Sequence, residues 1–443
     1  MNLLKLVPAA IALLSLAACS GEAKPEEAAP APKTPVTPPK APEAPAPAAA
    51  SAEVPADLPR GLLVTYSQFP VKDGQVQPIP GAARLELIRR EGGEWKTEVI
   101  EDKDSNVFHK AFVYGAGFVT IGGMDAVVKF WTRGADGALS SKVIWKEAFG
   151  GKFNRMRDAE VGAVYAGELD IPVGTHDQGV FAVLRPAGDS FKIEQLDKQA
   201  NTFIHEVELG DLDKDGALEV YTTPSEPNTL EGGAQHGEVV RYVPSKGEGR
   251  VVVADLGNRH AKEIYVGDVD GDGTDELYVA VEALTKGEGG SEIVEPVEIR
   301  RYDSGTDAKA GVVIAKIQDR FCRFLTVGDV DGDGKREMVA AAFKSGLWLL
   351  RPGKDPRGEW SSESIDRESG GFEHASVLAD LDGDKRDELY AASDDHGELR
   401  RYVWVNGRAK RSLVSKRDVP RSMMTWNLMP APAALLAPLP KGK

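Results

Sequence analysis

Four copies of one acidic loop, repeated at similar intervals, constrain this chain more than any other feature of its sequence. Each copy carries an Asp-x-Asp-x-Asp pattern, and the copies begin at Asp211, Asp268, Asp329 and Asp380. Successive first aspartates are 57, 61 and 51 residues apart. Repeats of this length are typical of propellers and solenoids, in which each repeat forms one supersecondary unit.

Short alternating segments flank the loops and predict four strands per repeat. In the second copy these runs cover residues 262–266, 276–281, 298–302 and 311–315. They have the length and alternation of strands, and turn residues separate them. A four-stranded repeat of this kind is the blade of a β-propeller.

The two ends of the repeat region complement each other. Residues 421–428 resemble a first strand with no blade after it, whereas residues 62–100 contain three strands with no first strand before them. Weaker copies fill the interval at residues 108–114 and 157–164, where Ala163 replaces the first aspartate. The C-terminal strand is therefore expected to complete the N-terminal blade and close the ring, which removes exposed sheet edges.

The Asp-x-Asp-x-Asp-Gly loops resemble the FG-GAP, or VCBS, repeats of integrin α-subunit propellers and of many bacterial surface proteins. The resemblance covers about residues 60–430, and it is specific in the four later repeats and faint in the first three. The pattern and the resemblance together imply an all-β, seven-bladed β-propeller of four-stranded blades over residues 59–430. Six or eight blades remain open if one weak copy is misread.

The spacing of the carboxylates in each loop suits calcium, which takes six to eight oxygen ligands. In the second loop we assign Asp268, Asp270, Asp272 and Glu276 as side-chain ligands, with the backbone carbonyl of Thr274. The matching residues are Asp211, Asp213, Asp215 and Glu219; Asp329, Asp331, Asp333 and Glu337; and Asp380, Asp382, Asp384 and Glu388. The family usually has Asp at the ninth position, so the longer Glu predicts altered coordination or a water in its place.

About four Ca²⁺ sites are expected, and the fourth is expected to be the weakest. Lys385 replaces glycine at the sixth position of that loop, which removes the easiest left-handed turn and adds a cation. The alternative is a set of solvated acidic turns without metal. Carboxylates packed this closely repel one another strongly without a cation, which favours calcium. The ions would rigidify the blades.

Cationic residues recur six positions before the first aspartate, or before Ala163 in the weak copy. These residues are Arg157, His205, Lys262, Arg323 and His374, and His109 or Lys110 falls nearby in the preceding copy. A propeller's first strand lines its central channel, so we expect a ring of cations at one channel mouth that could bind an anion. The alternative is that these are solvated strand ends, some of them paired with Glu206, Glu263 or Asp158.

The N-terminus resembles a bacterial lipoprotein signal. An apolar stretch after Lys5 is too short for a mature spanning helix and ends in Leu-Ala-Ala-Cys at residues 16–19. The resemblance implies a signal peptide over residues 1–18, cleavage before Cys19, and lipidation of that thiol. Ser20 in place of Asp favours the outer membrane, on its periplasmic or its outer face. The alternative is an ordinary secretory signal with a chance cysteine.

A lipidated Cys19 leaves Cys322 without a disulfide partner, and we expect it to be a buried structural thiol. The Pro/Ala-rich residues 19–58 have little to bury and predict a disordered tether. Residues 431–443 are expected to form a flexible tail.

The formal charge of −15 argues against nucleic-acid binding, and enzyme motifs are absent from the sequence. The leading hypothesis is a monomeric, membrane-anchored, extracytoplasmic binding or scaffold module with a protein or glycan partner. The alternative is a calcium-dependent polysaccharide lyase that uses His205 or His374 as a base at the channel mouth. A third hypothesis is a structural lipoprotein without a small ligand, and the fold alone does not choose among them.

Overall fold

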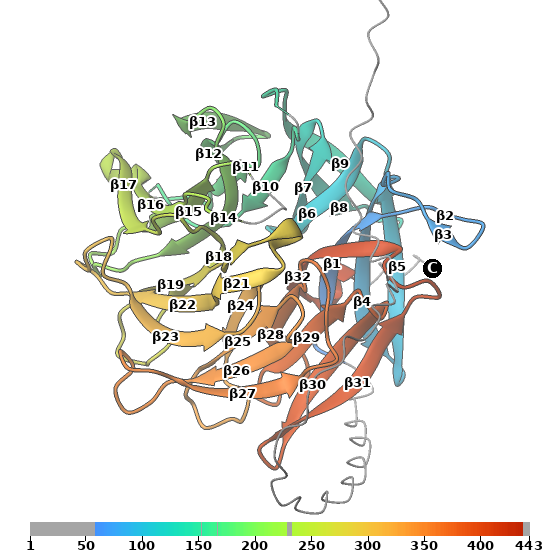
Figure 1. The fold of residues 1–443 in the computed structure, drawn as a ribbon. Helices are drawn as coiled ribbons and strands as arrows, with labels where there is room; N and C mark the ends of the chain where they lie inside the picture. The colour runs from blue at the N-terminus through green and yellow to red at the C-terminus, as the bar shows by residue number, and fades with distance from the viewer. Residues whose placement is uncertain (1–57, 152, 166, 228–232, 437–443) are drawn as a thin grey trace, which may run out of the picture.

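Seven four-stranded antiparallel sheets form a ring in the computed structural model (Figure 1). The structure describes residues 58–151, 153–165, 167–227 and 233–436. The expected signal peptide, the lipidation site Cys19 and residues 20–57 of the tether lie outside the described residues. The predicted all-β, seven-bladed architecture is confirmed, and helix is almost absent from the described part of the chain.

Each blade runs from an inner strand at the axis of the ring to an outer strand at its rim. Blades 1 to 3 consist of β32 (Met423–Pro432), β1 (Arg60–Gln68), β4 (Ala83–Glu91) and β5 (Glu94–Asp102); β6 (Ser105–Tyr114), β7 (Gly117–Met124), β8 (Ala126–Arg133) and β9 (Leu139–Glu147); and β10 (Met156–Ala159), β11 (Ile171–Thr175), β12 (Val180–Ala187) and β13 (Ser190–Lys198). Blades 4 and 5 consist of β14 (Phe203–Gly210), β15 (Glu219–Ser225), β16 (Glu238–Val243) and β17 (Glu248–Asp255); and β18 (Ala261–Gly267), β19 (Glu276–Val281), β22 (Val297–Tyr302) and β23 (Val312–Ile317). Blades 6 and 7 consist of β24 (Cys322–Gly328), β25 (Glu337–Ala342), β26 (Leu347–Arg351) and β27 (Ser361–Asp366); and β28 (Ser376–Ala379), β29 (Glu388–Ser393), β30 (Glu398–Val405) and β31 (Arg408–Lys416).

Short elements decorate this ring. Two small hairpins are formed by β2 (Val71–Lys72) with β3 (Gln75–Val76) and by β20 (Leu284–Lys286) with β21 (Glu292–Glu295). The helical turns are η1 (Pro244–Lys246), η2 (Glu288–Gly290) and α1 (Ala433–Leu436). No helix in the described ranges has the length and apolar character needed to cross a membrane.

The ring closes as the sequence predicted. β32, at the end of the chain, pairs antiparallel with β1 at its beginning, with Leu63 opposite Met429 and Val64 opposite Leu428. The N-terminal segment thus supplies three strands of blade 1 and the C-terminal segment supplies the inner one. Closure leaves every inner strand next to two others around the axis.

The core lies between adjacent blades. The second strands β15, β19, β25 and β29 are buried along their whole length, and after the first Glu they consist largely of apolar and small residues. One cluster joins Val339 and Leu349 of blade 6 to Leu389 and Tyr402 of blade 7. Burial of apolar surface between neighbouring sheets is the main favourable free-energy contribution in such a ring.

A β-bulge recurs at the same place on the inner strands. In six of the seven, the pairing register with the second strand shifts by one residue. The residues at the bulges are His109 in β6, Arg157 in β10, His205 and Glu206 in β14, Lys262 in β18, Arg323 in β24 and Trp426 in β32. A bulge turns a side chain out of the regular alternation of a strand. Four of the five cationic positions singled out in the sequence, all except His374, are therefore marked by a shared backbone feature.

The C-terminal boundary differs from the expected one. β32 continues to Pro432 and α1 follows it, so residues 431–436 are part of the packed domain rather than of a flexible tail. Leu436 is fully buried in a cluster with Leu63 and Leu87. The apolar Leu-Leu pair at the end of α1 packs against blade 1. Composition alone does not predict this packing. Residues 437–443 lie outside the described residues.

Candidate calcium loops and the charged axis

The four acidic loops occupy the same place in four successive blades. Each connects the inner strand to the second strand in blades 4, 5, 6 and 7. In each loop the three aspartates place one carboxylate oxygen each within 4.8 Å of the others, and in the second loop Glu276 joins them. Clusters of hard oxygen donors at this separation could hold a metal ion.

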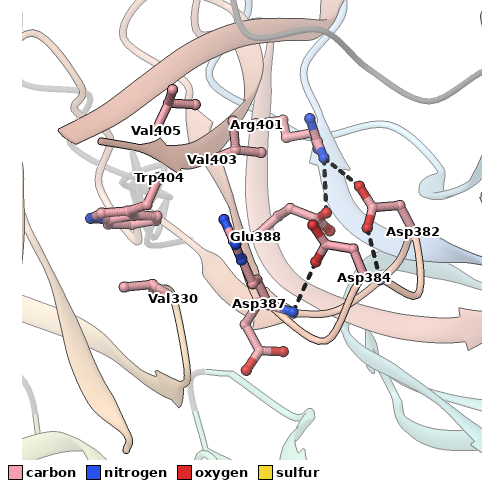
Figure 2. A pocket seen from close by; sticks show the side chains of 10 residues that line it. Val330, Asp382, Asp384, Asp387, Glu388, Arg401, Val403, Trp404 and Val405 are labelled. Atoms are coloured by element: carbon pink, nitrogen blue, oxygen red, sulfur yellow. Dashed lines mark hydrogen bonds and ion pairs between the residues drawn. The ribbon is translucent and has the colours of Figure 1, made fainter. Parts of the chain in front are cut away.

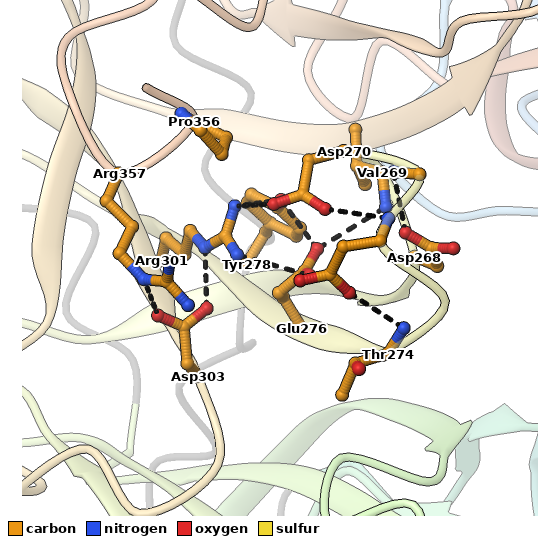
Figure 3. Close-up of polar contacts among 12 residues, drawn as sticks. Asp268, Val269, Asp270, Thr274, Glu276, Tyr278, Arg301, Asp303, Pro356 and Arg357 are labelled. Carbon is orange, nitrogen blue, oxygen red and sulfur yellow. Dashed lines mark hydrogen bonds and ion pairs between the residues drawn. The ribbon is translucent and has the colours of Figure 1, made fainter. Parts of the chain in front are cut away.

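In the second loop, backbone N–H groups converge on the carboxylates (Figure 3). Asp268 accepts hydrogen bonds from the N–H of Gly271 at 2.7 Å and of Gly273 at 2.9 Å. Asp272 accepts one from the N–H of Thr274 at 2.9 Å. The loop is thus folded around its first aspartate by its own backbone, and its carboxylates are held at one point.

Two left-handed residues shape every loop. In the second loop they are Gly271 and Gly273, with φ of 80° and 83°, and two glycines serve in the third loop as well. The first loop uses Lys214 at 57°, and the fourth uses Lys385 at 70°. A side chain in this region of φ/ψ space costs about 1–2 kcal/mol. The strain expected at Lys385 is therefore present.

The ninth-position glutamates lie behind the loops. Glu219, Glu276, Glu337 and Glu388 are all buried. Each accepts a hydrogen bond from the backbone N–H seven residues earlier, at 3.0, 3.3, 3.1 and 3.1 Å respectively. Among the described residues, only Glu276 joins a cluster in which its oxygen and those of all three aspartates lie within 4.8 Å of one another. The other three fasten the loop to the start of the second strand through these hydrogen bonds.

An arginine on the third strand, not identified from the sequence, faces each of these glutamates. Arg301 contacts Asp270 at 2.8 Å, Glu276 at 3.2 Å and Asp303 at 2.7 Å (Figure 3). The equivalent ion pairs are Arg241–Glu219 at 2.7 Å, Arg351–Glu337 at 3.6 Å and Arg401–Glu388 at 2.8 Å. Three of the four arginines precede a tyrosine, in Arg241-Tyr242, Arg301-Tyr302 and Arg401-Tyr402, and this repeat was the available signal.

Burial raises the pKa of three of these glutamates. It raises the pKa of Glu276 and of Glu337 to about 7 and that of Glu388 to about 8, against the lowering effect of the arginines. The fourth loop borders a cleft of about 350 Å³ lined by Trp404, Arg401 and the loop's own carboxylates (Figure 2).

Neighbouring loops are bonded to one another across the blade boundaries. Asp275 of the second loop accepts a hydrogen bond from the N–H of Asp211 in the first, at 2.9 Å. Arg336 of the third donates to the carbonyl oxygen of Asp268 in the second, at 2.9 Å. Asp387 of the fourth accepts from the N–H of Asp329 in the third, at 2.8 Å. The four loops therefore form one continuous band on the propeller.

Four of the five predicted channel cations come together at one end of the axis, namely Arg157, His205, Lys262 and Arg323. Arg157 and Arg323 both contact Glu373, at 3.6 and 2.8 Å, and Arg323 also contacts Glu282 at 3.1 Å. Lys262 reaches Glu282 at 4.0 Å. These side chains are largely buried and share two glutamates that sequence reasoning missed. Glu373 directly precedes His374, and Glu282 directly follows β19.

His374 does not belong to this group, which corrects the expected ring. It is fully buried with a positive φ of 56°, and its Nδ1 donates to the carbonyl oxygen of Ala342 at 2.7 Å. Its Nε2 then accepts from the Ser369 hydroxyl at 2.7 Å. Both ring nitrogens are engaged in the wall of the blade, so His374 has no lone pair left to act as a base. The preceding residue, Glu373, contacts the cations instead.

The carboxylates considered as partners for the cations gather elsewhere, around Lys110. Lys110 contacts Asp158 at 3.2 Å and forms an ion pair with Glu160. Burial raises the pKa of Glu206 and of Glu263 well above the usual value. The axis therefore carries an acidic zone next to the cationic end.

Cys322 is a free, buried thiol, as expected for a structural cysteine. Burial raises its pKa well above the usual value, which keeps the sulfur protonated and unreactive.

Comparison with known proteins agrees with the repeat pattern. The model of the FG-GAP-like repeat family matches residues 329–391, which run from the third loop through the other strands of blade 6 and the fourth loop to the second strand of blade 7. No curated protein sequence matches the chain significantly.

One solved structure supports the fold, and a second is more distant. A crystal structure of a protein from Lactobacillus plantarum superimposes with a TM-score of 0.53 at 9% identity, covering 84% of this chain and 99% of that one. Sqt1 from Chaetomium thermophilum gives a TM-score of 0.46 at 10% identity, covering 77% of this chain and 78% of that one. At such identities the first likeness concerns the fold alone.

Proposed function

We propose that this FG-GAP propeller is a calcium-stabilised binding or scaffold module, held at the bacterial outer membrane by a lipid on Cys19. The observation that carries the calcium proposal is the convergence of three aspartates in each of four equivalent loops, with Glu276 added in the second. Because hydrogen bonds join neighbouring loops, an ion bound in one loop would also restrain the loops next to it. Weak calcium sites, with dissociation constants of about 10⁻⁴–10⁻³ M, are adequate outside the cytoplasm.

The second loop supplies the sharpest test of calcium binding. Asp270→Asn removes one ligand charge and keeps the size of the side chain, and isothermal titration calorimetry should then count one site fewer than the wild type. The matched control is Asp307→Asn, which changes an exposed turn aspartate outside the four loops. Equal calcium stoichiometry and affinity in wild type and Asp270→Asn would contradict the assignment of this loop.

The membrane anchor is tested separately. Mass spectrometry of the mature N-terminus should find a diacylglyceryl group on Cys19, and Cys19→Ser should release the protein from the membrane fraction. Two or three acyl chains give firm anchoring, whereas one chain is marginal. An unmodified, soluble wild-type protein would rule out the anchor and leave the calcium proposal untouched.

A further inference from the structure

The cationic end of the axis contains more positive groups than its carboxylates balance. Arg155 adds a fourth cation to Arg157, Lys262 and Arg323; we call these four residues the axial cations. The carboxylates facing them are Glu282, Glu373 and Asp177. Four permanent or near-permanent positive charges thus face three negative ones, in a region where charge is costly to bury.

Several donors of this group have no acceptor. His205 is 2% exposed, and neither of its ring nitrogens has a hydrogen-bond partner among the described residues. The same holds for Nη2 of Arg323 and Nε of Arg155 in that part of the chain. A buried polar atom without a partner costs about 1–3 kcal/mol, so such groups normally face a ligand or water.

Phenylalanines surround the axial cations. Three of them, Phe203, Phe321 and Phe372, stand eight residues before the first aspartate of their repeats. The Arg323 guanidinium lies over the rings of both Phe321 and Phe372, at 4.6 and 4.2 Å from their centroids. Phe203 packs on the His176 ring at 4.1 Å. The donors are thus bordered by flat apolar surfaces, and Phe321 and Phe372 remain partly exposed.

We infer that this end of the axis binds an organic oxyanion, with a carboxylate or phosphate group on His205, Lys262 and Arg323 and an apolar or planar body against the phenylalanines. An oxyanion supplies the acceptors that these donors lack and the negative charge that the group lacks. The apolar body gains from burial against the rings. The inference is independent of the calcium proposal, because it involves none of the loop carboxylates.

Proton uptake is a signature of this site. Burial holds the pKa of His205 well below its usual value. The nearby positive groups lower it further, in the order Lys262, His176, Arg157 and His260. Burial and Arg323 lower the pKa of Lys262 to about 8. A bound anion reverses the charge balance and raises both pKa values, so binding near pH 8 should take up protons.

Benzoate is a suitable probe, because it joins a carboxylate to a flat apolar ring. Calorimetry of the full chain at pH 8, in two buffers of different ionisation enthalpy, should show benzoate binding with proton uptake. Inorganic phosphate should bind at least about tenfold more weakly, since it has no apolar body, and benzyl alcohol should not bind. Absence of benzoate binding, or equal binding of benzyl alcohol, would overturn the inference.

Variants locate the binding. Lys262→Met should weaken benzoate binding at least about tenfold, as loss of a charged hydrogen bond predicts. Lys192→Met, on the exposed outer strand β13, should leave it unchanged. Unchanged binding in folded Lys262→Met would overturn the assignment. If that variant does not fold, ¹⁵N NMR of the wild-type His205 ring decides, because its nitrogen shifts must move on adding benzoate, and their failure to move would reject the site.

Discussion

The Asp387 carboxylate accepts a hydrogen bond from the backbone N–H of Asp329 at 2.8 Å, across the boundary between blades 6 and 7. The N–H of Asp387 in turn donates to the carbonyl oxygen of Asp329, also at 2.8 Å. The first residue of one acidic loop is therefore fixed by the eighth residue of the next. A loop that binds metal would thereby restrain its neighbour, which links local coordination to the rigidity of the ring.

Asp387→Ala should destabilise the protein, because it leaves the Asp329 N–H without its acceptor. The expected loss is about 1–3 kcal/mol in the free energy of unfolding, measured by urea denaturation. Hydrogen exchange at the Asp329 amide should also accelerate. The control Asp189→Ala, at an exposed turn, should change neither quantity. Unaltered exchange at Asp329 in the Asp387 variant would contradict the bonded band.

Lys385→Gly should stabilise the fourth loop, because Lys385 is held at a φ of 70°. Relief of this strain is worth about 1 kcal/mol in the free energy of unfolding. Lys385→Ala separates charge from strain, since it removes the cation and keeps a Cβ in the left-handed region. The Lys385→Gly variant should therefore have a higher melting temperature than the Lys385→Ala variant. The reverse exchange Gly334→Lys, in the third loop, should lower it, and equal melting temperatures throughout would contradict the strain.

Arg301→Met should be far more damaging than Arg351→Met. Arg301 is 1% exposed and pairs with three carboxylates, so its loss leaves uncompensated buried charge and costs about 3–5 kcal/mol. The Arg351 side chain is 29% exposed and its contacts are 3.3–3.8 Å, so its loss should cost less than about 1 kcal/mol. Added calcium should regain part of the unfolding free energy that Arg301→Met loses, as measured by chemical denaturation. Equal losses in the two variants would contradict the proposed role of burial.

Acid should destabilise the protein through His205. Its pKa in the folded state lies well below the unfolded value of about 6.5, first because of burial and then because of nearby cations. Below pH 6.5 the unfolded chain binds a proton that the folded state does not, so stability falls as pH falls. The wild type should lose up to about 1.4 kcal/mol per pH unit relative to His205→Gln.

Unfolding free energies of both proteins at pH 7.5 and pH 5 test this expectation. Buried carboxylates such as Glu206 and Glu263 are present in both, so their opposite pH dependence cancels in the comparison. A pH-independent difference between the two proteins would contradict a neutral buried His205.

The repeat length and the two unmatched ends predicted the fold, since a ring must find a partner for every strand. The incomplete first blade and the lone strand near Trp426 could only be reconciled by pairing β1 with β32. The end of the domain, predicted at residue 430, could not be predicted correctly from the sequence. The packing of Leu436 depends on a surface of blade 1 that is formed by residues far away in the chain.

The candidate sites were predicted unevenly for a physical reason. Loop carboxylates are neighbours in sequence, so their spacing revealed them. Glu282 reaches Arg323, and Glu373 reaches Arg157 and Arg323, from other blades, so no local sequence pattern indicates these pairs. His374 had the correct spacing, but its ring is bonded within the blade wall, and the preceding Glu373 contacts the cations instead.

Thermal unfolding of the full mature domain in calcium and in excess chelator tests the central claim most directly. Ions that bind only the folded state stabilise it by mass action, at about 2.7 kcal/mol per site at a hundredfold excess over the dissociation constant. The melting temperature should rise by at least several degrees in calcium and fall back on chelation. Superimposable unfolding curves in the two conditions would contradict a propeller braced by metal in its four loops.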